Sequence, residues 1–247
     1  MDNQSMPEEK FWIDKYTPRK FEELDYNHNI NEILKTISSS DDFPHLIFYG
    51  PDGAGKKTRI KIFLSNLFGP GVYKTTTELK EIKINTINVE YLVVSSSYHI
   101  EVNPSDNENH DRHIVQKVIK ETASTGNVAQ VEKSKKPFKV IVLHDIDLLS
   151  RDAQAGLRRT MEKYMKTCRL IMSCSSLTKV INPIRSRCLC IRVAAPTVDE
   201  IKNSLVKIQL SENVDIPEKV LFSIAENSNR NLRKAINNLQ LSNLSLT

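Results

Sequence analysis

The stretch GPDGAGKKTR, residues 50–59, constrains the fold of this chain more than any other part of its sequence. A phosphate-binding loop follows the pattern G-x-x-x-x-G-K and then Ser or Thr. Gly50, Gly55 and Lys56 satisfy that pattern, but Lys57 stands where the hydroxyl is expected. A short apolar run that ends in glycine (residues 44–50) comes before the loop, and residues with near-helical apolar spacing (57–68) follow it. This context of strand, loop and helix predicts a phosphate or nucleotide site, the alternative being a plain glycine turn.

The rest of the chain predicts an α/β fold followed by a helical segment. Apolar runs predict further strands, at residues 91–97, 139–145, 168–175 and 188–193. Periodic segments between them predict helices, at residues 111–122 and 152–164. Nearly continuous apolar strands that alternate with helices are typical of a parallel sheet covered by helices on both faces. The polar stretch 124–137 has no periodicity, so we expect a surface loop there.

The composition of the chain changes at residues 194–197. Three helix-like segments follow that change, at residues 198–210, 217–227 and 231–241. The first has Thr197 as a predicted N-cap and acidic residues in its first turn. We therefore expect a P-loop nucleotide-binding domain over residues 1–195 and a small all-helical lid domain over residues 196–247.

Composition excludes several classes of protein. No apolar run approaches the roughly 20 residues that span a bilayer, and the polar, acidic N-terminus is no signal peptide, so we expect a soluble intracellular protein without membrane contact. The net charge of +5 is compatible with nucleic-acid binding but is weak support for it. The four cysteines lack zinc-ligand spacing, which predicts buried free thiols and no metal site.

The second half of a P-loop ATPase site is an apolar strand that ends in acidic residues, which serve the metal and the attacking water. The stretch VIVLHDID (residues 140–147) has this form, but His144 occupies the first acidic position and Asp145 replaces the usual glutamate. Together with Lys57, these changes predict a scaffold that does not hydrolyse nucleotide. The alternative is an ATPase in which Thr58 and Asp145 act in a shifted geometry, although Thr58 lies about 100° further round the helix than Lys57.

Two groups of basic residues can be interpreted either as solvated surface charges or as functional contacts. Arg185 and Arg187 precede a predicted strand, where they are either solvated edge charges or include an arginine finger for a neighbouring subunit. Arg112, Lys117 and Lys120 lie on one amphipathic helix, whose basic face is either solvated or contacts the phosphates of a duplex.

The motifs occur in one order over nearly the whole chain, and together they resemble a small subunit of the eukaryotic clamp loader, replication factor C, in the AAA+ class. The segments that carry the resemblance are WIDKYTP (12–18), GPDGAGKKTR (50–59), VNPSDNENHDR (102–112), DAQAGLRRTMEKY (152–164), PIRSRC (183–188) and NLRKAINNLQ (231–240). The SRC triplet and the QAxLRRTMExY helix are the most specific of them. Within the family, the match is best to the small subunit whose loop reads GKK and which does not hydrolyse nucleotide.

The resemblance implies a role for several residues. Arg187, in the SRC triplet, would reach the ATP site of the adjacent subunit. Arg233 matches an arginine that senses the γ-phosphate in active members, Ser175 stands where those members carry a sensing asparagine, and Tyr16 fits the adenine-side box, in which Thr17 replaces the usual arginine. ATP or ADP would be held without hydrolysis and with weak or no Mg²⁺. The residues implied as nucleotide contacts are Tyr16, Gly50, Gly53, Ala54, Gly55, Lys56, Lys57, Thr58 and Arg233.

The resemblance also implies partners. Arg112, Lys117 and Lys120 would face primer–template DNA inside a five-subunit spiral, which loads the sliding clamp during replication and repair in the nucleus. The other clamp-loader subunits and the clamp itself would be the protein partners. A helical collar domain, which continues beyond the lid in the family, is missing from these 247 residues. Besides the shifted-site ATPase, a DNA-binding or adaptor module outside any loader remains open.

Overall fold

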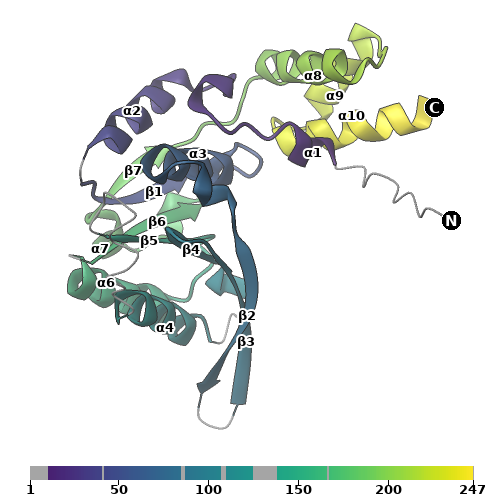
Figure 1. The fold of residues 1–247 in the computed structure, drawn as a ribbon. Coiled ribbons are helices and arrows are strands. Elements are labelled where there is room, and N and C mark those ends of the chain that lie inside the picture. The colour runs from purple at the N-terminus through teal and green to yellow at the C-terminus, as the bar shows by residue number, and fades with distance from the viewer. Residues whose placement is uncertain are drawn as a thin grey trace, which may run out of the picture.

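The computed structural model describes residues 11–40, 42–84, 87–106, 110–124, 138–165 and 167–246. Residues 1–10 and most of the predicted surface loop, residues 125–137, lie outside the described part of the chain. Figure 1 shows a central sheet with helices on both sides and a separate group of helices at one end.

The described strands form one seven-stranded sheet in the order β2-β3-β4-β5-β6-β1-β7. Their bounds are β1 His45–Tyr49, β2 Thr76–Ile84, β3 Ile87–Ser95, β4 His99–Val102, β5 Lys139–Leu143, β6 Cys168–Cys174 and β7 Cys188–Arg192. The strands from β4 to β7 are paired in parallel, as the alternation of strands and helices predicts. The sheet is mixed, however, because β2 and β3 form an antiparallel hairpin and β3 pairs antiparallel with β4.

The described helices form two layers on the sheet and a separate group at one end. Their bounds are α1 Trp12–Lys15, α2 His28–Ser39, α3 Lys56–Phe68, α4 Asp111–Ser124, α6 Arg151–Tyr164, α7 Asn182–Arg185, α8 Val198–Glu212, α9 Glu218–Asn227 and α10 Leu232–Leu246. Helices α2 and α3 lie on one face of the sheet, and α4 and α6 on the other (Figure 1). Successive residues of β1 serve the two layers, since Leu46 and Phe48 pack with α3 while Ile47 packs in the cluster with α4 and α6.

A third apolar cluster joins α8, α9 and α10. Trp12 of α1 is buried in it, and its backbone N–H donates to Gln240 Oε1 at 3.1 Å. Lys15 forms an ion pair with Glu212 of α8 at 2.7 Å. The start of the described chain therefore packs onto the C-terminal helices, and the division at residue 195 stays a prediction.

Other sequence-based expectations concern membranes and thiols. Within the described ranges, no helix has the length and apolar character needed to cross a bilayer. All four cysteines are free thiols, as predicted, but only Cys168 and Cys174 are buried, whereas Cys188 and Cys190 are half-buried. The difference arises because β7 is an edge strand, so its side chains are covered from fewer directions.

Candidate nucleotide-binding site

The glycine-rich loop joins β1 to α3 in a conformation that depends on two glycines. Gly53 has φ +75°, and a Cβ built there would lie 1.9 Å from Oδ1 of Asn231, the residue just before α10. Gly55 has φ +80°, and its Cβ would lie 2.7 Å from the hydroxyl oxygen of Tyr26. Both glycines thus combine a left-handed backbone with a close approach that a side chain would prevent.

The loop is held by side chains from its own helix. Lys56 is buried, and its ammonium donates to the carbonyl oxygens of Gly50 at 2.6 Å and Pro51 at 3.1 Å. Arg59, one turn further along α3, is completely buried and donates to Ala54 O at 3.2 Å and Tyr26 O at 2.8 Å. The Tyr26 hydroxyl donates to the same Ala54 carbonyl at 2.9 Å. Sequence reasoning included Arg59 in the motif without a role, and the structure gives it one as a clamp on the loop.

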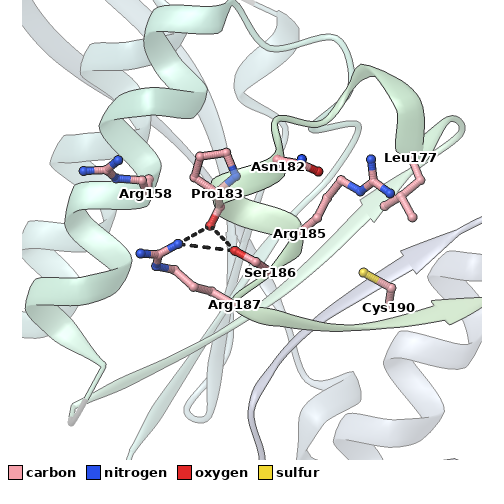
Figure 2. Close-up of a pocket in the computed structure, with 8 residues that line it drawn as sticks. All are labelled: Arg158, Leu177, Asn182, Pro183, Arg185, Ser186, Arg187 and Cys190. Carbon is pink, nitrogen blue, oxygen red and sulfur yellow. Dashed lines mark hydrogen bonds between the residues drawn. The ribbon is translucent and has the colours of Figure 1, made fainter.

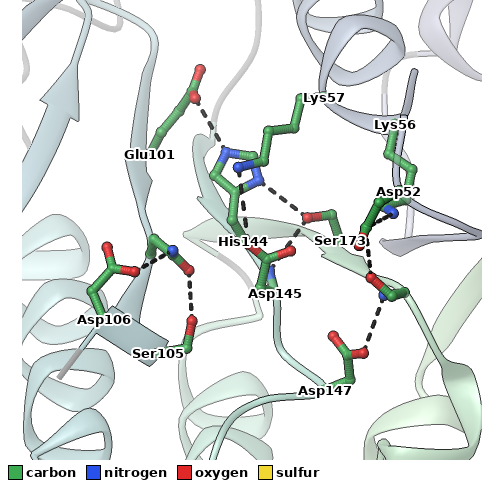
Figure 3. A network of polar contacts seen from close by, with 12 residues as sticks. Asp52, Lys56, Lys57, Glu101, Ser105, Asp106, His144, Asp145, Asp147 and Ser173 are labelled. Atoms are coloured by element: carbon green, nitrogen blue, oxygen red, sulfur yellow. Dashed lines mark hydrogen bonds and ion pairs between the residues drawn. The ribbon is translucent and has the colours of Figure 1, made fainter. Parts of the chain in front are cut away.

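The end of β5 carries a buried polar network, drawn in Figure 3. Glu101 of β4 lies between two histidines, with His144 Nε2 at 3.3 Å and His99 Nε2 at 3.0 Å. His144 Nδ1 lies 3.1 Å from the hydroxyl of Ser173 on β6. Burial would raise the pKa of Glu101, but hydrogen bonds from His144 and His99 outweigh burial and hold it well below its usual range. Both ring nitrogens of His144 are therefore engaged, Nε2 by Glu101 and Nδ1 by Ser173.

Lys57 and Asp145 meet between the loop and the end of β5 (Figure 3). The Lys57 ammonium lies 3.9 Å from Asp145 Oδ2. Asp145 has φ +52°, which is uncommon for a residue other than glycine, and its backbone N–H donates to Ser173 Oγ at 3.4 Å. The lysine that replaces the expected hydroxyl therefore pairs with the carboxylate that replaces the expected glutamate.

A second carboxylate lies inside the loop itself. Asp52 Oδ1 accepts a hydrogen bond from Ser175 Oγ at 2.8 Å and lies 3.3 Å from Lys56 Nζ. The hydrogen bond from Ser175 lowers the pKa of Asp52, and the positive charges of Lys56 and Arg233 lower it further. Asp52 was not among the predicted site residues, although an acidic residue in a phosphate loop was the available signal.

A cavity of about 640 Å³ adjoins the loop. It brings together six of the nine predicted nucleotide contacts, namely Tyr16, Gly53, Gly55, Lys57, Thr58 and Arg233. Gly50, Ala54 and Lys56 belong to the loop but do not line this cavity, and all three are buried. Residues from α8 and α10, such as Lys207 and Ile236, complete the wall. The shape is that of a small-molecule site between a sheet and a helical lid.

The residues do not fit a Mg²⁺ site of the kind that P-loop enzymes use. Residue 57 offers an ammonium instead of a hydroxyl, and the His144 imidazole is engaged by Glu101. The Asp145 carboxylate is paired with Lys57, and the Asp52 carboxylate is held by Lys56 and Ser175. Among the described residues, no group of three or more His, Cys, Asp or Glu side chains is arranged to hold a metal ion.

Arg187 lies on a different face, just before β7, in a shallow depression that Figure 2 shows in close-up. Its guanidinium donates to Pro183 O at 2.8 Å and forms an ion pair with Glu162 of α6 at 2.7 Å. The side chain is 41% exposed, and Arg158 and Arg185 line the same depression. The face thus concentrates three arginines at the start of an edge strand.

The predicted DNA-contacting residues share α4. Arg112 and Lys120 are exposed, whereas Lys117 is half-buried. The Lys117 ammonium donates to Glu81 O at 2.6 Å and lies 3.7 Å from Glu121. The structure therefore leaves Arg112 and Lys120 on the surface but ties Lys117 to the β2 strand.

Comparison with known proteins adds family information to this geometry. A family model described as DNA polymerase III, delta subunit, matches residues 26–197, and one described as RCF1/5-like, AAA+ ATPase lid domain, matches residues 203–241. The chain is 45% identical to probable replication factor C subunit 3 of Dictyostelium discoideum, over 91% of this chain and 65% of that protein. It is 46% identical to replication factor C subunit 3 of Bos taurus and to subunit 5 of Schizosaccharomyces pombe, over 91% of this chain and 63% of each relative.

The chain thus spans slightly less than two thirds of the length of these relatives. Among solved structures, a RuvB structure from Thermotoga maritima matches with a TM-score of 0.61 at 16% identity, over 91% of this chain and 64% of that one, which supports the AAA+ fold alone. The loop, the mixed sheet, the helical lid and the matched family models agree with one another. The chain therefore belongs to the family described as DNA polymerase III, delta subunit, and it has an AAA+ fold and is similar to replication factor C subunits 3 and 5.

Proposed function

We propose that this chain is a clamp-loader subunit that binds nucleotide without hydrolysing it and donates Arg187 to the ATP site of a neighbouring subunit. It would act in a nuclear complex with the other loader subunits, the sliding clamp and primer–template DNA, in replication and repair. The similarity to replication factor C subunits 3 and 5 supports the class of complex. The observation that carries the absence of hydrolysis is the pairing of Lys57 with Asp145.

The pairing opposes hydrolysis for two reasons. Phosphoryl transfer to water in P-loop enzymes needs a metal ion on the β- and γ-phosphates and a group that orients the water. Lys57 supplies a fixed positive charge where the metal would be held, and it occupies the nearest carboxylate. His144, at the other acidic position, is held by Glu101 (Figure 3). In the proposed state, ATP or ADP binds in the cavity lined by Tyr16 and Arg233, with the Lys57 charge in place of Mg²⁺.

The alternative, an ATPase with Thr58 and Asp145 in a shifted geometry, is less well supported. Thr58 lines the cavity, but Asp145 would have to leave Lys57 before it could accept a proton from water or bind a metal. The non-hydrolysing function is therefore the better match to the contacts around the loop.

The trans-acting role of Arg187 is supported by its position. The side chain is half-exposed, and its hydrogen bond to Pro183 O holds it at the start of an edge strand, where a neighbouring subunit can approach. Its ion pair with Glu162 is exposed, so exchanging it for a phosphate costs little. An arginine supplied in trans stabilises the charge that develops on a transferring phosphoryl group.

The test is ATP turnover by the assembled loader, stimulated by clamp and DNA, with Arg187→Ala in this subunit. A fall of at least about tenfold with assembly intact is expected, since arginine fingers contribute factors of this size or larger. Arg192→Ala, an exposed arginine at the other end of β7, is the matched control and leaves turnover unchanged. Unchanged turnover with Arg187→Ala would refute the trans-acting role.

A further inference from the structure

Two groups that could bind a terminal phosphate contact the carboxylate of Asp52, and the charge of a third lowers its pKa. The Lys56 ammonium, which reaches the β- and γ-phosphates in a phosphate-binding loop, lies 3.3 Å from Asp52 Oδ1. The Ser175 hydroxyl donates to the same oxygen at 2.8 Å. Arg233, on α10 at the wall of the cavity, acts on Asp52 through its charge. A carboxylate with these partners has the surroundings of a bound phosphate oxygen.

Asp52 is also open to solvent. Its side chain is 80% exposed, whereas its partner Lys56 is 7% exposed, so the carboxylate covers the lysine from the solvent side. In Figure 3 the Asp52 carboxylate lies beside the Lys56 ammonium, on the side of the loop that faces the end of β6. A terminal phosphate that reached Lys56 at ordinary hydrogen-bond length would come within about 6 Å of Asp52, because about 2.8 Å would add to the 3.3 Å already separating Lys56 from Asp52.

We propose that Asp52 is a specificity-determining residue, which occupies the groups that a terminal phosphate needs and makes the loop prefer a nucleoside diphosphate to a triphosphate. This inference rests on the proposed binding of nucleotide and adds the phosphorylation state that the site selects. A diphosphate has no terminal phosphate to place beside Asp52, so the backbone of the loop is enough to hold it. A triphosphate must either displace Asp52 from Ser175 and Lys56 or accept the repulsion between two anions.

The size of the preference follows from charge. Two like unit charges about 6 Å apart repel by about 0.7 kcal/mol in water and several-fold more near a protein surface, and the terminal phosphate carries more than one charge. A preference of at least about tenfold for the diphosphate is therefore expected, which is equivalent to about 1.4 kcal/mol.

The experiment compares the affinities of ADP and the non-hydrolysable triphosphate AMPPNP for the full chain by calorimetry, without added metal. The variants are Asp52→Asn, which keeps the shape and removes the charge, and Asp215→Asn, the same change at an exposed aspartate between α8 and α9 and outside the cavity. Thermal melting of each variant checks that it is folded. Because Asp52 is largely exposed, the Asp52→Asn melting temperature should stay near that of the wild type.

In the expected result, the wild type and Asp215→Asn bind ADP at least about tenfold more tightly than AMPPNP, and Asp52→Asn reduces this ratio to within about threefold by gaining AMPPNP affinity. An equal ratio in the wild type and Asp52→Asn would overturn the role of Asp52 and leave nucleotide binding intact. If neither protein bound either nucleotide, the proposed nucleotide binding itself would fail, and this inference with it.

Discussion

The contact between Gly53 and Asn231 ties the phosphate loop to the helical lid, and it makes a quantitative prediction. In Gly53→Ala, the new Cβ meets two penalties. The backbone at φ +75° costs an alanine about 1–2 kcal/mol. The Cβ would also lie 1.9 Å from Asn231 Oδ1, so this side chain must move.

The movement of Asn231 has its own cost. Its Oδ1 accepts a hydrogen bond from the Lys234 backbone N–H at 3.1 Å, which caps the start of α10. Loss of such a cap costs typically about 1 kcal/mol. Gly53→Ala should therefore lower the free energy of unfolding by about 2–3 kcal/mol, the sum of the backbone and cap terms.

A double-mutant cycle separates the two terms. In an Asn231→Ala background the cap is already lost, so Gly53→Ala should cost only the backbone term of about 1–2 kcal/mol. Urea denaturation followed by circular dichroism gives the four free energies of unfolding. If Gly53→Ala cost the same in both backgrounds, Asn231 would not constrain the loop. If it cost less than about 0.5 kcal/mol in the wild type, the left-handed backbone would not be required either.

Three further predictions concern the site, the sheet and the basic helix. Lys57→Thr combined with His144→Asp should raise ATP turnover and make nucleotide binding respond to Mg²⁺, whereas unchanged turnover would favour the shifted-site ATPase. Burial, and then the charge of a neighbouring arginine, lower the pKa of His45 to about 4, below the 6.5 of an ordinary histidine. As the pH falls, His45 therefore takes up its proton in the unfolded chain before it does so in the folded chain. The free energy of unfolding should fall as pH drops from about 6.5 to about 4, by at most about 1.4 kcal/mol per pH unit. His45→Asn should remove this contribution from the pH dependence of stability, measured by thermal melts at a series of pH values. Arg112→Ala and Lys120→Ala should each reduce the slope of log affinity for duplex DNA against log salt by about 1, and an unchanged slope would remove α4 from the DNA interface.

Sequence reasoning located β1, β5, β6 and β7 because buried parallel strands are nearly continuous apolar runs, and it located most helices, but it missed the short strand β4 inside the sheet. The strand β2, which follows α3, was not predicted. In β2, residues 76–84, most side chains are exposed and charged residues such as Lys80 and Glu81 interrupt the apolar ones, so no continuous apolar run marks it. Its partner β3 was found from residue 91 onward, where Tyr91 and Val93 are buried. An exposed edge hairpin therefore leaves a weaker sequence signal than a buried strand.

The candidate site shows the same limit. Local pattern was enough to find Lys56, Lys57 and the altered residues after β5. The partner of Asp52 could not be found in that way, because Ser175 lies 123 residues away along the chain and only the pairing of β1 with β6 brings them together. Contacts of this kind depend on sheet register, which single-sequence patterns do not give.

The pairing of β1 with β7 has a mechanical consequence. The two strands run in parallel with His45 opposite Cys188 and Tyr49 opposite Arg192. The phosphate loop leaves one end of this pair and Arg187 enters at the other, so about five residues, or roughly 17 Å of strand, separate them. A β-strand is nearly inextensible along its length, so the pairing of β1 with β7 keeps the distance between the phosphate loop and Arg187 fixed. If Arg187 reaches the nucleotide of a neighbouring subunit as proposed, this distance would set the spacing between the two nucleotides, and a shift of the loop along the strand axis would move the arginine by the same amount.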